Sequence, residues 1–570
     1  MILSYLFYIS RYILPLAAAG IIFRCARSLL SGRYEPEVWG YMELPDGARV
    51  PLRNWECTVG ASRGCDVRLQ GLGAAQLVLL RDGEGNWTAH NISPNTDVFI
   101  EDEPIFEDGL PLRDGDTLEA GGQLLRFYNL SESERRVVTS RRTAPGRFVR
   151  AWDMFIYISL FLVILLFQHI MTAQEEFVAP ITLAFTALFA LMWSYYVLMR
   201  LFGRRGLEIE ALAFFLSGLG LSVCASCSPE SMRKQVLLII AGLAAFLLLG
   251  AWLRDLKRVK SARLWAAVLA GVLLAVNIIF GTARNGSNNW IELGGVTIQP
   301  SEFVKILYIY AGAATMDRLY LKKNILLYVA FSAACVGALA LMGDFGTALV
   351  FFAAFLVISF LRSGNFATIV LALTGAALAG FLAMNVKPYI AERIALWRHA
   401  WEDVYVAGFQ QTRAMSAAAS GGLFGTGAGG GWLNSIVASK TDMVFALISE
   451  ELGLLVALTA LAALIVMAVF VVRNAARARS SFFVIAGVGA VAMMLVQTCF
   501  NVFGSLDILP FTGVTFPFVS MGGSSLISCW AMLAFIKATD TRRSASFVVK
   551  QPGRIHDRNE FTAEESFEEN

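Results

Sequence analysis

The sequence predicts a polytopic all-α membrane protein with a small all-β domain near its N-terminus. Of the 570 residues, 56% are hydrophobic and 16% are charged, and the mean hydropathy is +0.59. Soluble domains typically have about 45–50% apolar and about 25% charged residues. Apolar stretches near the ~20 residues of a spanning helix recur from residue 152 onward. Residues 35–130 are instead polar, rich in Gly and Asp, and contain short β-prone runs.

The composition also excludes several classes of function. The net charge of +3 is too small for a dedicated nucleic-acid binder, so we expect no nucleic-acid partner. The chain has four histidines, which argues against histidine-based metal catalysis. Cys224 and Cys227 form a single CxxC without a second pair, whereas a zinc site needs four ligands.

The first segment predicts a membrane anchor over residues 1–30. Residues 1–23 are apolar apart from Arg11 and are followed by Arg24 and Arg27. A signal peptide has its positive charge before the apolar core and a small-residue cleavage site after it. Because the order is reversed here, we expect an anchor that is not cleaved.

The next segment predicts the β domain, over residues 35–130. The runs Gln76–Leu80 and Leu124–Tyr128 are typical of short strands. Residues 131–151 then form a linker rich in arginine. These features favour a separate folded unit attached to the membrane part by a basic connector.

Twelve apolar segments follow, and each is long enough to be a candidate span. We expect helices at 154–172, 178–199, 208–227, 235–252, 264–281, 300–316, 325–342, 345–361, 369–387, 443–472, 482–504 and 515–536. Gly343 and Asp344 alone separate two of these segments, which predicts a tight helical hairpin.

Clusters of Lys and Arg in the short loops set the expected orientation, because they accumulate on the cytoplasmic side. Placing these clusters inside makes the β domain and the polar tail 541–570, which we expect to be disordered, cytoplasmic. Residue 1 and the long loops 282–299 and 388–441 are then outside. Arg233 and Lys234 are the exception, since they fall on the outer side.

Ionisable residues near the outer helix ends are the first candidates for chemistry, since charges in spanning regions are costly and suggest function. They are Glu302, Lys305, Asp344, Asp442, Glu450 and Glu451. Glu302 and Lys305 stand three residues apart on a helix and can pair, so a structural ion pair is the alternative. The loop 388–441 adds Arg393 and Arg398 among aromatic residues, which suits a polar, anionic headgroup at the membrane interface.

Four motifs resemble the SEDS family of FtsW, RodA and SpoVE. They are Asn288–Lys305 (NNWIELGGVTIQPSEFVK), Gly343–Thr347 (GDFGT), Thr441–Gly453 (TDMVFALISEELG) and Pro510–Ser525 (PFTGVTFPFVSMGGSS). Members of this family are bacterial membrane glycosyltransferases that polymerise lipid II with a class B penicillin-binding transpeptidase. The resemblance implies a ten-helix core starting at residue 208, with the helices at 1–23, 154–172 and 178–199 as additions.

The resemblance also implies functional residues. The family's essential aspartate falls on Asp442, which we expect to be the general base. The expected substrate contacts are Trp290, Glu302, Lys305, Asp344, Arg393, Arg398, Lys440, Glu450, Ser520 and Ser524. Three positions depart from the family pattern: Asn289 stands where Arg is usual, Phe345 replaces a leucine, and the run Val437–Lys440 replaces Pro-Glu-x-His.

The region 50–128 resembles a forkhead-associated domain, a β-sandwich that binds phosphothreonine. The matching parts are Thr58–Gly60, Cys65–Leu69, Asn95 and Leu112–Thr117. The expected phosphate-binding arginine is replaced by Ala61, and the usual Ser-Arg-x-His segment reads Gly73–Gln76. Phosphate recognition needs such charge-assisted donors. A docking role toward a cytoplasmic protein is therefore favoured over phosphothreonine binding, for which Arg63 is the remaining candidate.

These features predict a cell-membrane enzyme with an anchor (1–30), a cytoplasmic forkhead-like domain (35–130), a linker (131–151), two additional helices (152–205), a glycosyltransferase core (206–540) and a tail (541–570). Asp442 would take the proton of the attacking sugar hydroxyl while cations stabilise the departing diphosphate. No cofactor is required, although Mg²⁺ or Mn²⁺ could assist. The alternatives are a lipid II transporter and an inactive scaffold for wall synthesis. For Asp442 the structural alternative is helix capping.

Overall fold

The computed structural model describes most of the chain. The described residues are 2–30, 38–53, 56–62, 65–81, 85–93, 97–106, 108–131, 133–134, 137, 150–284, 287–293, 296–316, 322–363, 366–386, 388–475, 480–542 and 545–548. Most of the arginines predicted for the linker, together with Arg63, Asn95 and the tail beyond residue 548, lie outside them.

Helices make up the membrane part. They are α1 (Ile2–Leu30), α3 (Ala151–Thr172), α4 (Glu175–Leu201), α5 (Glu208–Cys227), α6 (Met232–Trp252), α7 (Leu256–Ser261), α8 (Arg263–Phe280), α9 (Pro300–Met316), α10 (Lys322–Leu341), α11 (Phe345–Ser363), α12 (Phe366–Val386), α13 (Pro388–Leu396), α14 (Phe409–Gly421), α15 (Val444–Glu451), α16 (Leu454–Ala475), α17 (Ser481–Ser505) and α18 (Gly523–Ala538), with 3-10 turns η1 (Pro229–Ser231) and η2 (Leu433–Ser435). Among the described residues, nine helical segments are long and apolar enough to cross a membrane. The predicted polytopic helical fold is confirmed.

Two of the sequence-based helix boundaries were wrong. The segment 443–472 is two helices, α15 and α16, because the chain breaks at Gly453, whose φ of +91° suits glycine alone. The segment 515–536 becomes helical only at Gly523. The loop 282–299, which was predicted to lie outside, contains a small antiparallel sheet of β12 (Thr282–Arg284), β13 (Ser287–Leu293) and β14 (Val296–Ile298).

The predicted hairpin is present. Helices α10 and α11 are joined at Met342–Asp344, and Gly343 has a φ of +80°. The loop 388–441 is not irregular throughout, because it contains α13, α14 and η2. The loop therefore has structure of its own, which fixes its position on the helix bundle.

The β domain contains two sheets that share one core. The first has the order β2 (Arg49–Leu52), β1 (Gly40–Glu43), β11 (Gln123–Asn129), β10 (Thr117–Ala120), β7 (Val98–Ile100), β8 (Glu103–Pro104), and the second β4 (Val67–Arg68), β3 (Glu56–Gly60), β5 (Leu77–Arg81), β6 (Trp87–Asn91), β9 (Leu110–Leu112). Trp87 of one sheet contacts Phe127 of the other, with ring centroids 5.6 Å apart. The predicted β-sandwich is confirmed.

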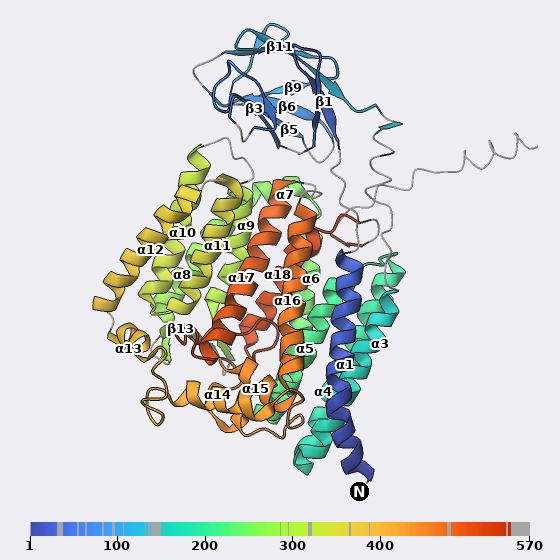
Figure 1. Ribbon diagram of the computed structural model, residues 1–570, viewed down its shortest axis with the longest axis vertical. Helices are drawn as coiled ribbons and strands as arrows, with labels where there is room; N and C mark the ends of the chain where they lie inside the picture. The colour runs from blue at the N-terminus through green and yellow to red at the C-terminus, as the bar shows by residue number, and fades with distance from the viewer. Residues whose placement is uncertain are drawn as a thin grey trace, which may run out of the picture.

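The β domain and the α13–α15 region lie at opposite ends of the helix bundle (Figure 1). The N-terminus of α1 lies at the same end of the bundle as α13, α14 and α15, whereas α7 lies at the end nearest the β domain (Figure 1). We call the end formed by α13, α14 and α15 the α13–α15 face.

The tail does not leave the bundle at residue 541, contrary to expectation. Phe547 and Val548 are buried, and the ring of Phe547 packs against Phe246 with centroids 5.1 Å apart. Arg254 donates from Nε to the Phe547 carbonyl at 2.6 Å. Apolar burial and this bond hold residues 545–548 against α6.

Candidate active site

An irregular segment between α17 and α18, residues 506–522, lies at the centre of the predicted site. We call it the central segment. Asn501 of α17 fixes the residues around Asp442 to it: its Nδ2 donates to the carbonyls of Asp442 at 3.0 Å and Val514 at 2.9 Å, with a longer contact to Thr441 at 3.4 Å. Ser520 adds a bond from Oγ to the Thr441 carbonyl at 2.6 Å. The backbone of Asp442 is therefore held from two sides.

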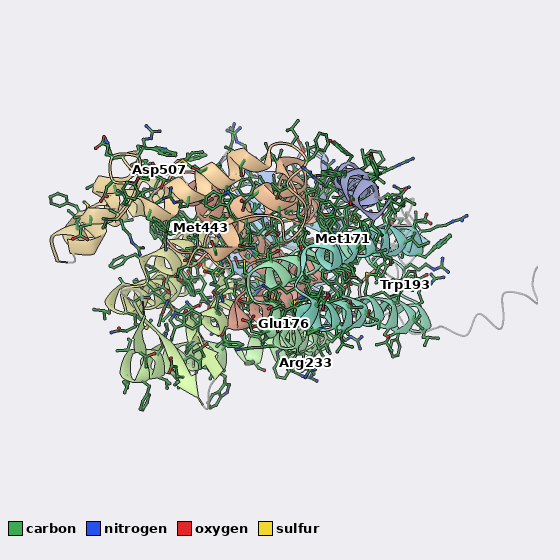
Figure 2. The ribbon with its side chains drawn as sticks, turned by 90° about the horizontal axis from the view of Figure 1, so that it is seen from below. Met171, Glu176, Trp193, Arg233, Met443 and Asp507 are labelled. Atoms are coloured by element: carbon green, nitrogen blue, oxygen red, sulfur yellow. The ribbon has the colours of Figure 1, made fainter. Side chains whose placement is uncertain are left out.

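Asp442 lies in a tight turn just before α15. Ala438 adopts a φ of +70°, which is unusual for a residue with a side chain, and its carbonyl accepts from the Asp442 N–H at 2.9 Å. The residue capping α15 is Met443, and no side chain caps it. The capping alternative for Asp442 is therefore wrong. Figure 2 views the molecule from the α13–α15 face, where Met443 lies between Asp507 and Met171.

The carboxyl group of Asp442 is partly buried against the central segment. A Cβ built on Gly513 would lie 3.4 Å from Asp442 Oδ2, which places this residue of the central segment directly beside the carboxylate. Burial raises the pKa of Asp442 from 3.8 to about 6, opposed by a hydrogen bond from Thr441 and by the positive charge of Arg393. The shift brings the pKa close to neutrality, which suits a general base.

Helix α13 and the residues that follow it bring two arginines to the central segment. Arg393 is exposed and donates from Nη1 to the Phe511 carbonyl at 3.4 Å, and Trp397 donates from Nε1 to Ile508 at 3.0 Å. The backbone N–H of Arg398 donates to Asp507 Oδ1 at 3.2 Å. Both predicted arginines therefore stand at the rim of the central segment.

Asp344 lies at the start of α11 and holds the other side of the site. Its Oδ2 accepts from Asn289 Nδ2 at 2.7 Å and from Gln299 Nε2 at 3.4 Å. The backbone N–H of Gln299 donates to Ser524 Oγ at 3.0 Å. Asn289, at the position where the family usually has arginine, thus connects the outer sheet to Asp344. Trp290 lies beside it in β13 and is partly exposed.

Glu302 and Lys305 form the pair that their spacing predicts. Lys305 Nζ donates to Glu302 Oε1 at 2.8 Å, and Ser528 Oγ donates to Glu302 Oε2 at 2.8 Å. The side chain of Lys305 is 1% exposed and that of Glu302 is 4% exposed. This geometry matches the structural ion pair left open as the alternative, because the ammonium is enclosed by the bundle.

Glu450 is buried and both of its carboxylate oxygens accept backbone N–H groups, from Trp432 at 2.9 Å and Leu433 at 3.0 Å. Ser520 and Ser524 are also buried and bonded within the protein. Lys440 is partly exposed and donates to Ser228 Oγ at 2.8 Å. The geometry therefore gives Glu450 and the two serines positions that support the site, and direct substrate contact by them stays a prediction.

Asn501 was missed by the sequence reasoning. It lies in a mostly apolar helix, and the buried polar residues near its C-terminal end are the signal that points to it. Within the described residues, no group of three or more His, Cys, Asp or Glu side chains is arranged to hold a metal ion.

We expect Asn501→Leu to lower the catalytic rate of the site by about 10- to 100-fold, because a shift of about 1 Å in a reacting group costs that much. The variant removes the donor to three carbonyls on both sides of the Asp442 turn. Thr498→Val is the matched control, since Thr498 is buried on the same helix and bonds only to Met494 of its own helix. Equal activity in both variants would contradict the positioning role of Asn501.

The comparison with family models gives one match. Residues 223–545 match the model of the FtsW/RodA/SpoVE family, described as "Cell cycle protein". The matched range includes all four motifs and every side chain placed at the site above.

The chain is also similar to individual proteins. The chain is 30% identical over 326 residues to the peptidoglycan glycosyltransferase RodA of Mycobacterium tuberculosis, covering 54% of this chain and 69% of the relative. A solved structure from a study titled "Structural coordination of polymerization and crosslinking by a peptidoglycan synthase complex" is 26% identical, with a TM-score of 0.49, covering 58% of this chain and 96% of that one. A structure from a study of phosphothreonine-dependent FHA domain interactions is 20% identical, with a TM-score of 0.15, covering 16% of this chain and 98% of that one.

Proposed function

This chain belongs to the FtsW/RodA/SpoVE family, and from that membership we propose that it is a bacterial peptidoglycan glycosyltransferase that polymerises lipid II into glycan strands. The observation that supports the chemistry is the carboxyl group of Asp442, whose backbone is fixed by Asn501 and Ser520 beside the exposed Arg393. A multi-pass membrane protein is also what a lipid-linked substrate requires.

The reaction joins a sugar hydroxyl of one lipid II molecule to the anomeric carbon of another. Asp442 accepts the proton of the attacking hydroxyl as the new C–O bond forms and the bond to the lipid diphosphate breaks, an effect typically worth about 10²–10⁴-fold. The displacement inverts the anomeric carbon, so no covalent glycosyl-enzyme forms. One carboxylate is sufficient for this step.

The departing diphosphate needs positive charge as its own charge develops. Arg393 is the best-placed cation, because it is exposed and its charge acts on Asp442. Arg398 lies on the same rim, whereas Lys305 is enclosed with Glu302. We therefore assign the diphosphate contact to Arg393 in preference to Lys305, which the motif alone favoured. Mg²⁺ or Mn²⁺ would fit the same diphosphate chemistry.

The α13–α15 face is proposed to be extracytoplasmic and the β domain cytoplasmic. The two lie at opposite ends of the bundle, and α7, which carries Lys257, Arg258 and Lys260, lies at the β-domain end (Figure 1). Basic residues in short loops favour the cytoplasmic side. A class B penicillin-binding transpeptidase is the proposed partner outside, and a cytoplasmic protein is the proposed partner of the β domain.

Activity is expected to rise with pH through about 6 and to be constant above it, because Asp442 acts only when deprotonated and its pKa is about 6. Removing the positive charge in Arg393→Met raises that pKa and moves the acidic limb to higher pH. The measurement is the initial rate of polymerisation from pH 4.5 to 8.5 for both proteins. Coinciding acidic limbs would show that Arg393 does not act on the group that titrates.

The direct test is reconstitution. The full chain is purified with its cognate transpeptidase, lipid II is added, and glycan strands are resolved on a gel. Polymer that depends on the chain supports the proposal. Movement of labelled lipid II across vesicles without polymer would favour a transporter, and neither activity would favour a scaffold.

A further inference from the structure

We infer that α1 and α3, which lie outside the matched family region, act as a clamp on the glycine-rich loop 422–431, and that Gln168 of α3 is a positioning residue for the Asp442 segment. This inference rests on the proposed function for its kinetic part. The clamp is an addition of this chain to the matched family region, because both helices precede residue 223, where the family match starts.

Helix α3 holds the loop through two polar side chains. The N–H of Ala428 donates to Gln168 Oε1 at 2.9 Å, and Thr172 Oγ1 donates to the Ala428 carbonyl at 2.7 Å. Both backbone groups of one loop residue are thus bound by α3. Gln168 is 1% exposed, and a buried amide with such partners fixes geometry because leaving them unpaired is costly.

Helix α1 holds the same loop from its outer half. Arg11 donates from Nη2 to the Gly425 carbonyl, and the ring of Tyr12 lies 4.8 Å from that of Phe424. Arg11 is the lone charge within the apolar stretch of the anchor, and an ionisable residue there calls for a partner. The loop carbonyl supplies it.

The two helices act together because Gln168 also bonds to α1. Its Nε2 donates to Ser10 Oγ at 2.9 Å. The loop meanwhile fits closely against both helices: a Cβ on Gly427 would lie 2.3 Å from Phe7, and one on Gly429 would lie 2.6 Å from Thr172 Oγ1. The glycines permit an approach that no other residue allows.

The glycine-rich loop is in turn hydrogen-bonded to the C-terminal end of α15. The N–H of Gly427 donates to the Glu451 carbonyl at 2.8 Å, and the N–H of Gly429 donates to Glu451 Oε2 at 2.9 Å. Glu450 accepts from the two N–H groups at the start of η2. Because α15 starts at Val444, two residues after Asp442, the clamped loop fixes the element from which the Asp442 turn projects.

The chain connects the β domain directly to the two helices of the clamp. The β domain is inserted between α1 and α3, so its two connections to the membrane part are the two helices that hold the loop.

The test compares Gln168→Met and Thr172→Val, which remove the polar contacts with little change in size, with Gln235→Met. Gln235 is 2% exposed on α6, so this control also removes a buried amide. Full-length proteins in nanodiscs are measured by hydrogen exchange at residues 425–431 and by polymerisation of lipid II. We expect faster exchange and a roughly 10-fold lower kcat with little change in KM for the first two variants only.

Two results would overturn the clamp: unchanged exchange in the loop of both variants, or faster exchange with wild-type kcat. Equal loss in Gln235→Met would show a general effect of removing a buried amide and would also overturn it. Failure of the parent protein to polymerise would instead contradict the proposed function, and the exchange measurement would still decide whether α3 holds the loop.

Discussion

Asp442→Asn is expected to reduce lipid II polymerisation by about 10²–10⁴-fold, the usual contribution of a general base. The substitution keeps the size of the side chain and removes its ability to accept a proton. The backbone bonds that fix the turn come from Asn501 and Ser520 to carbonyl groups, so they do not depend on the carboxylate. The measurement is the rate of strand formation with the purified complex.

Asp403→Asn is the control for this experiment, because Asp403 is an aspartate of the loop 388–441 that accepts from the N–H groups of Val406 and Ala407. It should polymerise at the parental rate. Parental activity in Asp442→Asn, with the protein folded, would remove Asp442 from the mechanism and leave positioning as its role. The acidic limb of the pH profile should also disappear in any residual activity of Asp442→Asn.

Lys305→Met is expected to lower the free energy of unfolding by about 3–5 kcal/mol, the usual cost of leaving one partner of a buried pair uncompensated. The carboxylate of Glu302 would keep its bond from Ser528 but lose the ammonium at 2.8 Å. Titration of the detergent-solubilised protein with denaturant measures the free energy of unfolding. The double variant Glu302→Gln/Lys305→Met should recover much of the loss, because no unpaired charge remains.

Lys234→Met is the control, since Lys234 is exposed on α6. If Lys305→Met unfolds like the parent but binds lipid II more weakly, Lys305 contacts the substrate after all and the structural reading of the pair is wrong. If the single and double variants are equally unstable, the lost contribution is packing of the lysine stem and not charge pairing.

Much of the fold could be predicted because membrane helices and strands leave strong local signals. Apolar length located the helices, and short β-prone runs such as Gln76–Leu80 located β5. The break at Gly453 was missed because α15 and α16 are both apolar, so hydropathy cannot separate them. Burial of Phe547 was missed because it follows a polar stretch and depends on a contact with α6.

The candidate site was predicted in part. The motifs located Asp442, and the arginine- and aromatic-rich loop pointed to Arg393, whose side chain reaches the central segment and whose charge acts on Asp442. Arg398 reaches the segment through its backbone N–H. Lys305 and Glu450 were grouped with them because a sequence shows charge but not what encloses it. Asn501 was missed because its role consists of bonds to carbonyls far along the chain.

Composition and the order of four short motifs were enough to establish a helical membrane protein of this family, since apolar length and motif chemistry are properties of the chain itself. Only the tertiary structure decided which charged side chains are exposed to a substrate and which are buried in pairs. Burial and pairing depend on neighbours that can be hundreds of residues away in the chain. The link from α3 to the loop, 260 residues from Gln168 to Ala428, is of this second kind.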